Sequence, residues 1–347
     1  MKLDLVEELR CPACRGPLTL QVDEYAGEEI ETGALVCACR LVHPIRNGVP
    51  RLLPDRLAPI DVRIAAAFGY EWTHFRVDYE GVREHFLDWI APLQANDFKG
   101  KRVVDAGCGM GRHAREAARF GAAKVFALDL SDATLVARQY TRGEAAVHVI
   151  QADLRHPPLR GDIDVVYSIG VLNQLPNPQA GFDALAGLLR PGGALFAWVY
   201  AAEAGSFTSK IVDPVRARVT SHLPFPVLRA LTWLPAAVLA LLCRALTRLE
   251  KRRRTVEACL PWFTYFEQLG AFPFSLLHCM LFDQLVAPAA RYCRQDEFLS
   301  YFERAGLTHV ETSLRHGNGW RGIGRAPSSA PACEIAAPRP GAATPSL

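Results

Sequence analysis

From residue 101 onward the chain alternates between short apolar runs and segments whose apolar residues recur at helical spacing. Short runs rich in β-branched residues are typical of buried strands, and the spaced segments are typical of helices. The predicted strands are 102–107, 124–130, 146–153, 163–170 and 193–200, and the predicted helices are 115–120, 132–140 and 178–190. Because strands that alternate with helices form a parallel sheet covered on both faces, the pattern predicts a doubly wound α/β fold.

This alternation stops after residue 200 and resumes near residue 291, with a predicted helix at 295–307 and strands at 309–315 and 320–326. The seven strands predict a mostly parallel, Rossmann-like sheet. Between the two parts the pattern is helical, and we expect prolines to cut it into short pieces. The predicted organisation is a small β domain at 1–57, a helical lead-in at 58–97, a core at 98–200 and 291–325, a helical insert at 201–290 and a disordered tail at 326–347.

Composition narrows the class of protein. Half of the 347 residues are hydrophobic and 22% are charged, which is typical of a soluble globular enzyme. The net charge of +3 is too small to indicate a nucleic-acid partner by itself. The first ten residues mix charged and apolar side chains, so they do not form a secretory signal. Ten cysteines in a chain of this length favour reduced thiols and a cytoplasmic location.

The sharpest chemical signal is a glycine-rich turn, VVDAGCGMG, which follows the first predicted strand and precedes a helix. Its glycines are Gly107, Gly109 and Gly111. Glycines there permit a tight turn and let the backbone approach a ligand closely. Arg112 occupies the position of the third glycine of the G-x-G-x-x-G pattern, which favours a ligand without a diphosphate.

Acidic residues lie at the ends of three consecutive predicted strands. Asp105 is on the first strand, Asp129 follows Gly107 by 22 residues, and Asp153 ends the third strand. Ligands bind at the carboxyl ends of strands in this architecture. We expect the Asp129 carboxylate to accept hydrogen bonds from two ribose hydroxyls, and the carboxylate or backbone of Asp153 to meet the amine of an adenine.

At these residues the chain resembles class I S-adenosylmethionine-dependent methyltransferases. The resemblance extends over about 98–200 and 290–325 and includes DVVYSIGVLNQLPNP and LRPGGAL. It implies S-adenosylmethionine as cofactor, with Asp105 and the glycine turn at its methionine end and Ile169 and Gly170 lining the pocket. Where many relatives have two histidines, this chain has Asn173 and Gln174, neither of which is a base at neutral pH.

The N-terminal segment has the spacing of a metal site. Cys11 and Cys14 form a C-x-x-C pair, and Cys37 and Cys39 form the closer C-x-C pair. His43 is an alternative to Cys37, and a ribbon without metal and with free thiols is also open. The stretch resembles the small zinc-ribbon proteins that act as methyltransferase partners, which implies zinc, RNA or protein binding, or support of the catalytic domain.

The sequence of the insert gives information about the class of methyl acceptor. Its apolar run Ala230–Cys243 is interrupted by Pro235 and is short for a bilayer span of ~20 residues. A basic cluster with Lys251–Arg254 follows. The pattern predicts a buried lid helix followed by a solvated turn, a peripheral membrane contact to a lipid or lipid-linked acceptor, or a contact with RNA phosphates.

Candidate acid–base residues are few. His278 and Asp283 in the insert form one candidate pair, and His74 in the lead-in is a rival. The leading hypothesis is methylation of a small-molecule, lipid or glycan-type acceptor. RNA methylation is the alternative in which the ribbon binds RNA, although the apolar insert does not favour a nucleic-acid substrate. A silent partner protein and a nicotinamide-dependent dehydrogenase are disfavoured by the acids and the glycine spacing. The acceptor atom and the oligomeric state are left open by the sequence.

Overall fold

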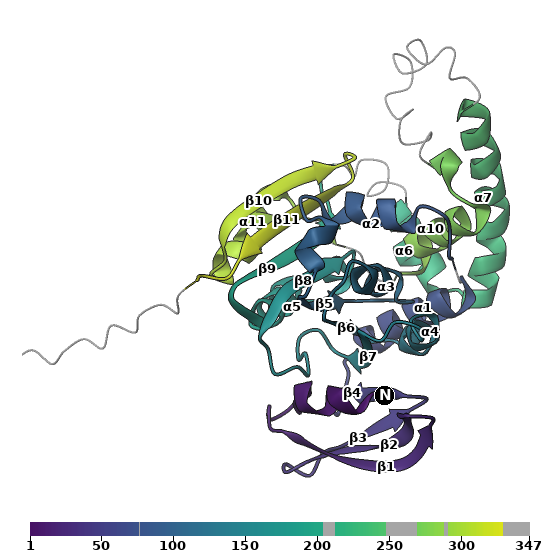
Figure 1. Cartoon of the computed structure of the whole chain (residues 1–347). Helices are drawn as coiled ribbons and strands as arrows, with labels where there is room; N and C mark the ends of the chain where they lie inside the picture. Colours follow the sequence, from purple (N-terminus) through teal and green to yellow (C-terminus); the bar gives the residue numbers. More distant parts are fainter. Residues whose placement is uncertain (76, 204–211, 248–268, 288–290, 329–347) are drawn as a thin grey trace, which may run out of the picture.

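The computed structural model describes residues 1–75, 77–203, 212–247, 269–287 and 291–328 (Figure 1). Its centre is a sheet whose strand order is β1-β2-β3-β4-β7-β6-β5-β8-β9-β11-β10. The seven predicted core strands are β5 (Arg102–Ala106), β6 (Lys124–Asp129), β7 (Val147–Ala152), β8 (Ile163–Ile169), β9 (Leu189–Tyr200), β10 (Thr308–Arg315) and β11 (Gly319–Arg325). The strands from β5 to β9 are parallel, and β11 is antiparallel to both β9 and β10. The predicted fold class is confirmed.

Helices cover both faces of this sheet. On one face lie α2 (Val82–Ile90), the short helix η2 (Ala95–Phe98) and α3 (Arg112–Arg119), with α4 (Ala133–Tyr140) near the β6–β7 edge. On the other face lie α5 (Pro178–Ala186) and α11 (Gln295–Arg304). Neighbouring strand residues alternate between the two cores, as the period of a strand requires: Val103 packs with the first group and Val104 with the second.

The helix predicted at 178–190 is too long. Helix α5 ends at Ala186, and β9 begins at Leu189 because that residue pairs with Ile163 of β8. The apolar spacing of the segment does not determine where helix α5 ends. The pairing of Leu189 in the sheet determines it.

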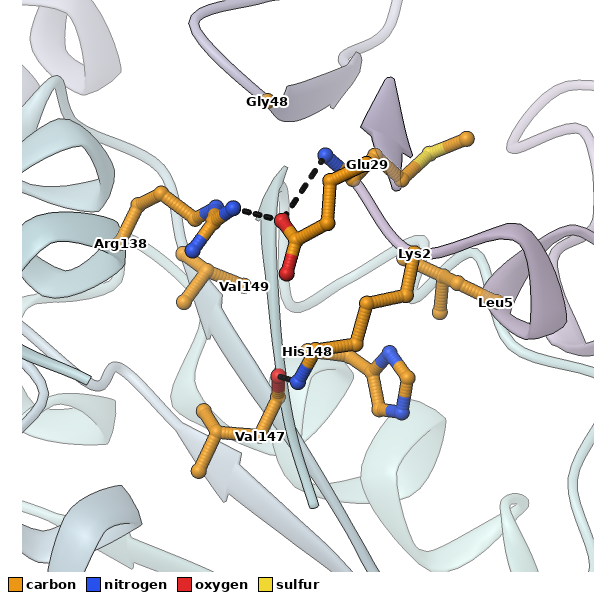
Figure 2. Close-up of a pocket in the computed structure, with 9 residues that line it drawn as sticks. Lys2, Leu5, Glu29, Gly48, Arg138, Val147, His148 and Val149 are labelled. Atoms are coloured by element: carbon orange, nitrogen blue, oxygen red, sulfur yellow. Dashed lines mark hydrogen bonds and ion pairs between the residues drawn. The ribbon is translucent and has the colours of Figure 1, made fainter. Parts of the chain in front are cut away.

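The N-terminal segment does not form a separate sheet. It contains the short helix η1 (Leu3–Glu8) and strands β1 (Leu18–Ala26), β2 (Glu29–Cys37), β3 (Val42–Arg46) and β4 (Val49–Leu52). Strand β4 pairs in parallel with β7, so the small β domain extends the edge of the central sheet. Figure 2 shows the contact beside this pairing, where the Lys2 ammonium donates to the Val147 carbonyl and Arg138 pairs with Glu29. The ribbon-like part is thus fixed to the core by both backbone and charged contacts.

The lead-in and the insert pack together over one end of the sheet (Figure 1). The lead-in supplies α1 (Pro59–His74), and the described part of the insert contains α6 (Asp213–Arg218), the short helix η5 (Thr220–His222), α7 (Phe225–Thr247) and α10 (Phe274–Val286). Helix α1 contacts α4 and α10, and α7 lies against α10. These contacts bring a lead-in helix and an insert helix to the carboxyl ends of the core strands.

The expectation that prolines cut the insert into short pieces is wrong for α7, which continues through Pro235. A proline removes one helical hydrogen bond, but Pro235 lies on the exposed side, where water can solvate the freed carbonyl. The opposite side carries Leu228, Thr232 and Ala236, which are buried. Phe225–Leu246 is consequently 22 residues long, so by length and composition it is not short for a bilayer. Its most apolar 18-residue window has a mean hydropathy of 1.8, and only 22% of that window is buried.

Candidate active site

The glycine turn lies between β5 and α3 and is covered closely by other side chains. Gly107, Gly109 and Gly111 have φ angles of 89°, 51° and 84°, which favour glycine. A Cβ on Gly107 would lie 2.2 Å from a methyl carbon of Val171, and one on Gly109 would lie 2.8 Å from the Trp72 indole nitrogen. The turn therefore needs glycine for both its backbone conformation and its surroundings.

Asp129 ties the end of β6 to this turn. One carboxylate oxygen accepts a hydrogen bond from the Gly109 N–H at 2.9 Å. The other accepts from the backbone N–H of Ser131 at 2.8 Å and from its hydroxyl at 2.6 Å. A carboxylate has about four acceptor positions, so a half-buried Asp129 keeps capacity for a further donor such as a ribose hydroxyl.

Asp105 on β5 is only 3% exposed, and its Oδ2 has no hydrogen-bond partner among the described residues. Burial raises the pKa of Asp105 to about 7, and the nearby Asp129 carboxylate raises it further in the same direction. The buried Tyr167 hydroxyl faces Asp105 and favours its ionised form, so it lowers the pKa of Asp105 against the effect of burial. Buried polar atoms are normally paired, so the unpaired oxygen of Asp105 is suited to accept a hydrogen bond from a polar or cationic ligand.

The other predicted cofactor residues have different surroundings. The Asp153 carboxylate accepts charged hydrogen bonds from Arg155, which also reaches Asp61 of α1. Both carboxylate oxygens thus have a protein donor, and an adenine contact by Asp153 stays a prediction. Ile169 and Gly170 end β8 and are half-buried, and Gly170 lies beside the Trp198 ring. Their place in the pocket also stays a prediction.

These residues fit the methionine and ribose parts of S-adenosylmethionine. The fit rests on the left-handed glycine turn, the unpartnered oxygen of Asp105 and the remaining acceptor capacity of Asp129. All three belong to adjacent parallel strands or to the turn between them, at the carboxyl end of the sheet.

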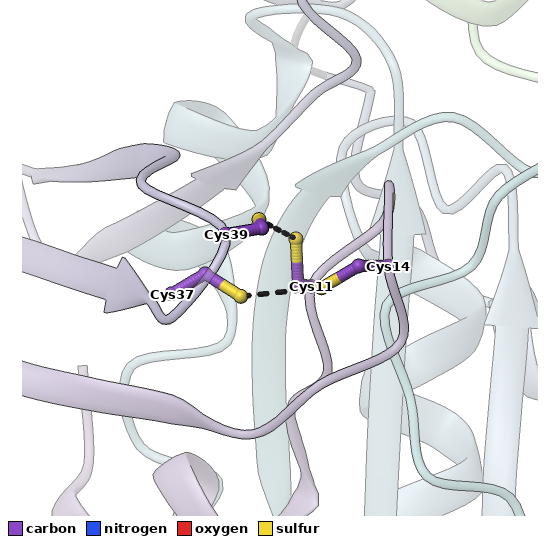
Figure 3. Close-up of side chains that lie close together, drawn as sticks. All are labelled: Cys11, Cys14, Cys37 and Cys39. Atoms are coloured by element: carbon purple, nitrogen blue, oxygen red, sulfur yellow. Dashed lines mark hydrogen bonds between the residues drawn. The ribbon is translucent and has the colours of Figure 1, made fainter.

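Four cysteines gather at one end of the N-terminal domain (Figure 3). The sulfur atoms of Cys11, Cys14, Cys37 and Cys39 all lie within 4.8 Å of one another. A tetrahedral zinc ion with bonds of about 2.3 Å holds its sulfur ligands about 3.8 Å apart. The Cys14–Cys37 and Cys11–Cys39 sulfur distances of 3.3 and 3.7 Å are close to that value. His43 Nε2 lies 3.8 Å from the Cys11 sulfur, beside the cluster. The cysteine set can therefore bind zinc without His43.

The predicted acid–base residues do not come together. His278 lies in α10, and its Nε2 is 3.0 Å from both the Thr232 hydroxyl and the Arg229 carbonyl oxygen of α7. Asp283 lies five residues further along α10, beside Gln284 and the Tyr200 ring at the end of β9. Burial raises the pKa of Asp283 to about 6. His74 is exposed and stacks on Tyr70. Of the three, Asp283 alone faces the strand end, and the catalytic role of each stays a prediction.

Sequence reasoning missed Glu71, which lies in α1 and is 1% exposed. One oxygen accepts from the Cys279 thiol at 3.3 Å, and the other has no partner among the described residues. Burial and the nearby Asp283 raise the pKa of Glu71 well above its usual value. The available signal was an acid inside an aromatic run, FGYEWTHF, at a position that the helix turns inward.

Comparisons with known proteins find a family match for each of two segments of the chain. Residues 2–48 match the family described as Trm112p-like protein, and residues 104–197 match the family described as methyltransferase domain.

Curated relatives cover part of the chain. A ubiquinone biosynthesis O-methyltransferase of Erwinia tasmaniensis is 36% identical over 114 residues, which are 32% of this chain and 46% of the relative. A tRNA U34 carboxymethyltransferase of Idiomarina loihiensis is 29% identical over 152 residues, 42% of this chain and 43% of the relative. The chain spans about half the length of the curated relatives it matches.

Solved structures match at low identity. A magnesium protoporphyrin IX methyltransferase from Synechocystis PCC 6803 with bound SAM has a TM-score of 0.45 and 14% identity, and the match covers 79% of this chain and all of that one. A complex between the Haloferax volcanii Trm112 methyltransferase activator and a methyltransferase has a TM-score of 0.44 and 16% identity, covering 77% and 97% of the two chains.

Proposed function

We propose that this chain, which contains an S-adenosylmethionine-dependent methyltransferase domain behind a Trm112p-like segment, transfers a methyl group to an apolar small-molecule, lipid or glycan-type acceptor. One observation carries the proposal. The glycine turn is hydrogen-bonded to Asp129 and follows Asp105, whose buried Oδ2 has no hydrogen-bond partner among the described residues. A protein that used the fold only as a scaffold has no need of an unpaired buried acid there.

The chain's own residues account for binding and alignment. When bound, S-adenosylmethionine supplies an electrophilic methyl group on a sulfonium, so the protein has mainly to hold the acceptor in line at about 3–3.5 Å and exclude water. Asp105 and the glycine turn hold the methionine end, and Asp129 holds the ribose. Trp72 and Val171 pack on the turn.

A hydroxyl acceptor must also lose a proton. Asp283 would accept this proton, and bound S-adenosylmethionine would supply the methyl group for the acceptor oxygen. The pKa of about 6 leaves this carboxyl ionised at neutral pH, and a base whose pKa is close to the working pH is the most effective one. His278 is the weaker candidate because its Nε2 already faces two oxygens of α7.

The surface of α7 supports an apolar acceptor at a membrane. Its side away from α10 exposes large apolar side chains, namely Val227, Leu231, Leu234, Val238, Leu241 and Leu242. Monomeric soluble proteins rarely expose a continuous apolar face of this kind. The basic cluster with Lys251–Arg254, which lies outside the described residues, follows the helix in the sequence and matches the charge of anionic lipid. We therefore propose that the protein is cytoplasmic and contacts a membrane reversibly.

RNA is the second candidate acceptor. It is favoured by the similarity to a tRNA-modifying enzyme and by the Trm112p-like segment. The exposed apolar face of α7 argues against it, because a phosphate backbone binds to charged surfaces.

Transfer of a labelled methyl group separates these functions. The protein is incubated with methyl-labelled S-adenosylmethionine and with either an organic-solvent extract or purified RNA from the organism in which it naturally occurs. Label in the organic fraction, absent with Asp105→Ala, is the expected result. Label in RNA selects the second candidate, and failure of the protein to bind S-adenosylmethionine in calorimetry rejects both.

A further inference from the structure

Helix α1 runs along the edge of the glycine turn. At Gly69 the helix packs on the start of α4, since an added Cβ there would lie 3.5 Å from the Asp132 backbone nitrogen. At Trp72 the helix contacts the turn itself, because the indole lies against Gly109. Glu71 precedes Trp72 in the helix, and its carboxyl group faces Cys279 of α10, where both Asp283 and Arg112 act on it electrostatically.

The Glu71 carboxyl is buried and incompletely paired. The Cys279 thiol is a weak donor to one oxygen, and the other oxygen has no donor among the described residues. The nearest charge of the same sign is Asp283 on α10, and Tyr200 of β9 also faces the group. An isolated buried carboxylate is costly, and a cationic partner removes that cost.

Arg112, which lies beside Trp72, offers the opposite charge. It is the first residue of α3, directly after the glycine turn, and its guanidinium lies over the Trp72 ring at 5.3 Å. Within the described ranges, no hydrogen bond or ion pair of the Arg112 side chain is present, and the guanidinium attracts the Glu71 carboxyl electrostatically. A cation that stacks on an indole keeps its N–H groups available for an anionic ligand.

We propose that Glu71 binds the α-ammonium and Arg112 binds the α-carboxylate at the methionine end of S-adenosylmethionine, next to the glycine turn that Trp72 covers. This inference rests on the proposed function and assigns a second acid, from α1, to the end of the cofactor that Asp105 approaches from β5. An ammonium and a carboxylate on one carbon atom need an acid and a guanidinium in close proximity, and planar guanidinium groups bind carboxylates with two hydrogen bonds.

Calorimetric titration with three ligands tests this assignment. S-adenosylmethionine and S-adenosylhomocysteine carry the α-ammonium and α-carboxylate, whereas 5′-methylthioadenosine carries neither. We expect Glu71→Gln and Arg112→Gln each to weaken binding of the first two ligands at least tenfold and to leave binding of 5′-methylthioadenosine within about twofold. Arg63→Gln, an exposed position of the same helix, and Glu84→Gln, an exposed position of α2, are the controls and should bind all three ligands normally.

The outcomes distinguish this assignment from the proposed function. If the unsubstituted protein does not bind S-adenosylmethionine, the function itself is wrong. If it binds and neither substitution matters, or if 5′-methylthioadenosine is weakened equally, the assignment is wrong and the function stands. Thermal melting of each variant checks folding, and Arg112→Gln, which is only half-buried, serves if Glu71→Gln does not fold.

Discussion

We expect the ionised Asp105 carboxylate to lower the free energy of unfolding and to strengthen binding of S-adenosylmethionine. The substitution Asp105→Asn separates these two effects. The folded protein raises the pKa of this carboxyl from 3.8 to about 7. A raised carboxyl pKa means that the folded state holds a proton that the unfolded state has released, so the wild-type protein loses stability as the pH rises from 3.8 to about 7. Asparagine resembles the protonated acid and does not ionise, so it avoids that loss.

The magnitude follows from the two pKa values. A tenfold change in proton affinity is worth about 1.4 kcal/mol, so the advantage of Asp105→Asn should be about 2 kcal/mol at pH 5 and about 4 kcal/mol at pH 8. Urea unfolding of both proteins at these two pH values, without ligand, measures it. At pH 8, saturating S-adenosylmethionine should stabilise the wild type and leave the variant unchanged.

The free energy of unfolding of the variant could instead equal that of the wild type at pH 8, or the difference between the two could fail to grow with pH. Either result would show that folding does not raise the pKa of Asp105. A variant that keeps full S-adenosylmethionine affinity would show that the carboxylate is not part of the cofactor site.

Three further predictions concern the other parts of the molecule. Gly109→Ala forces a Cβ against Trp72 in a left-handed backbone conformation, so we expect a loss of about 1–3 kcal/mol in urea unfolding and loss of cofactor binding; an unaffected protein would contradict the crowding. The protein as purified should contain one zinc ion per chain by atomic absorption, and Cys11→Ser should lower both the zinc content and the melting temperature, whereas full metal content in the variant would exclude the cysteine set. Leu234→Glu with Leu241→Glu on α7 should reduce sedimentation with anionic vesicles at least tenfold without lowering S-adenosylmethionine affinity, and equal sedimentation of both proteins would rule out this membrane contact.

The sequence by itself determined the order of the core elements and the resemblance to methyltransferases. Apolar runs and spaced helical segments are local properties, so the strands ending at Asp105 and Asp129 could be located within a residue or two. The glycine turn was equally recognisable, because its conformation depends on the absence of a side chain at fixed positions. The C-x-x-C and C-x-C pairs are local too, and their resemblance to small zinc-ribbon proteins agrees with the family matched by residues 2–48.

The tertiary structure decided which distant segments meet. The pairing of β4 with β7, the burial of Glu71 between α1 and α10 and the contact of His278 with α7 join residues far apart in the chain, and no local period encodes such contacts. Packing also decided that α7 continues through Pro235, since the stripe buried against α10 stabilises the helix on both sides of the missing hydrogen bond. Local propensity sets which elements form, but only the complete fold sets which charges are buried and which apolar face remains open.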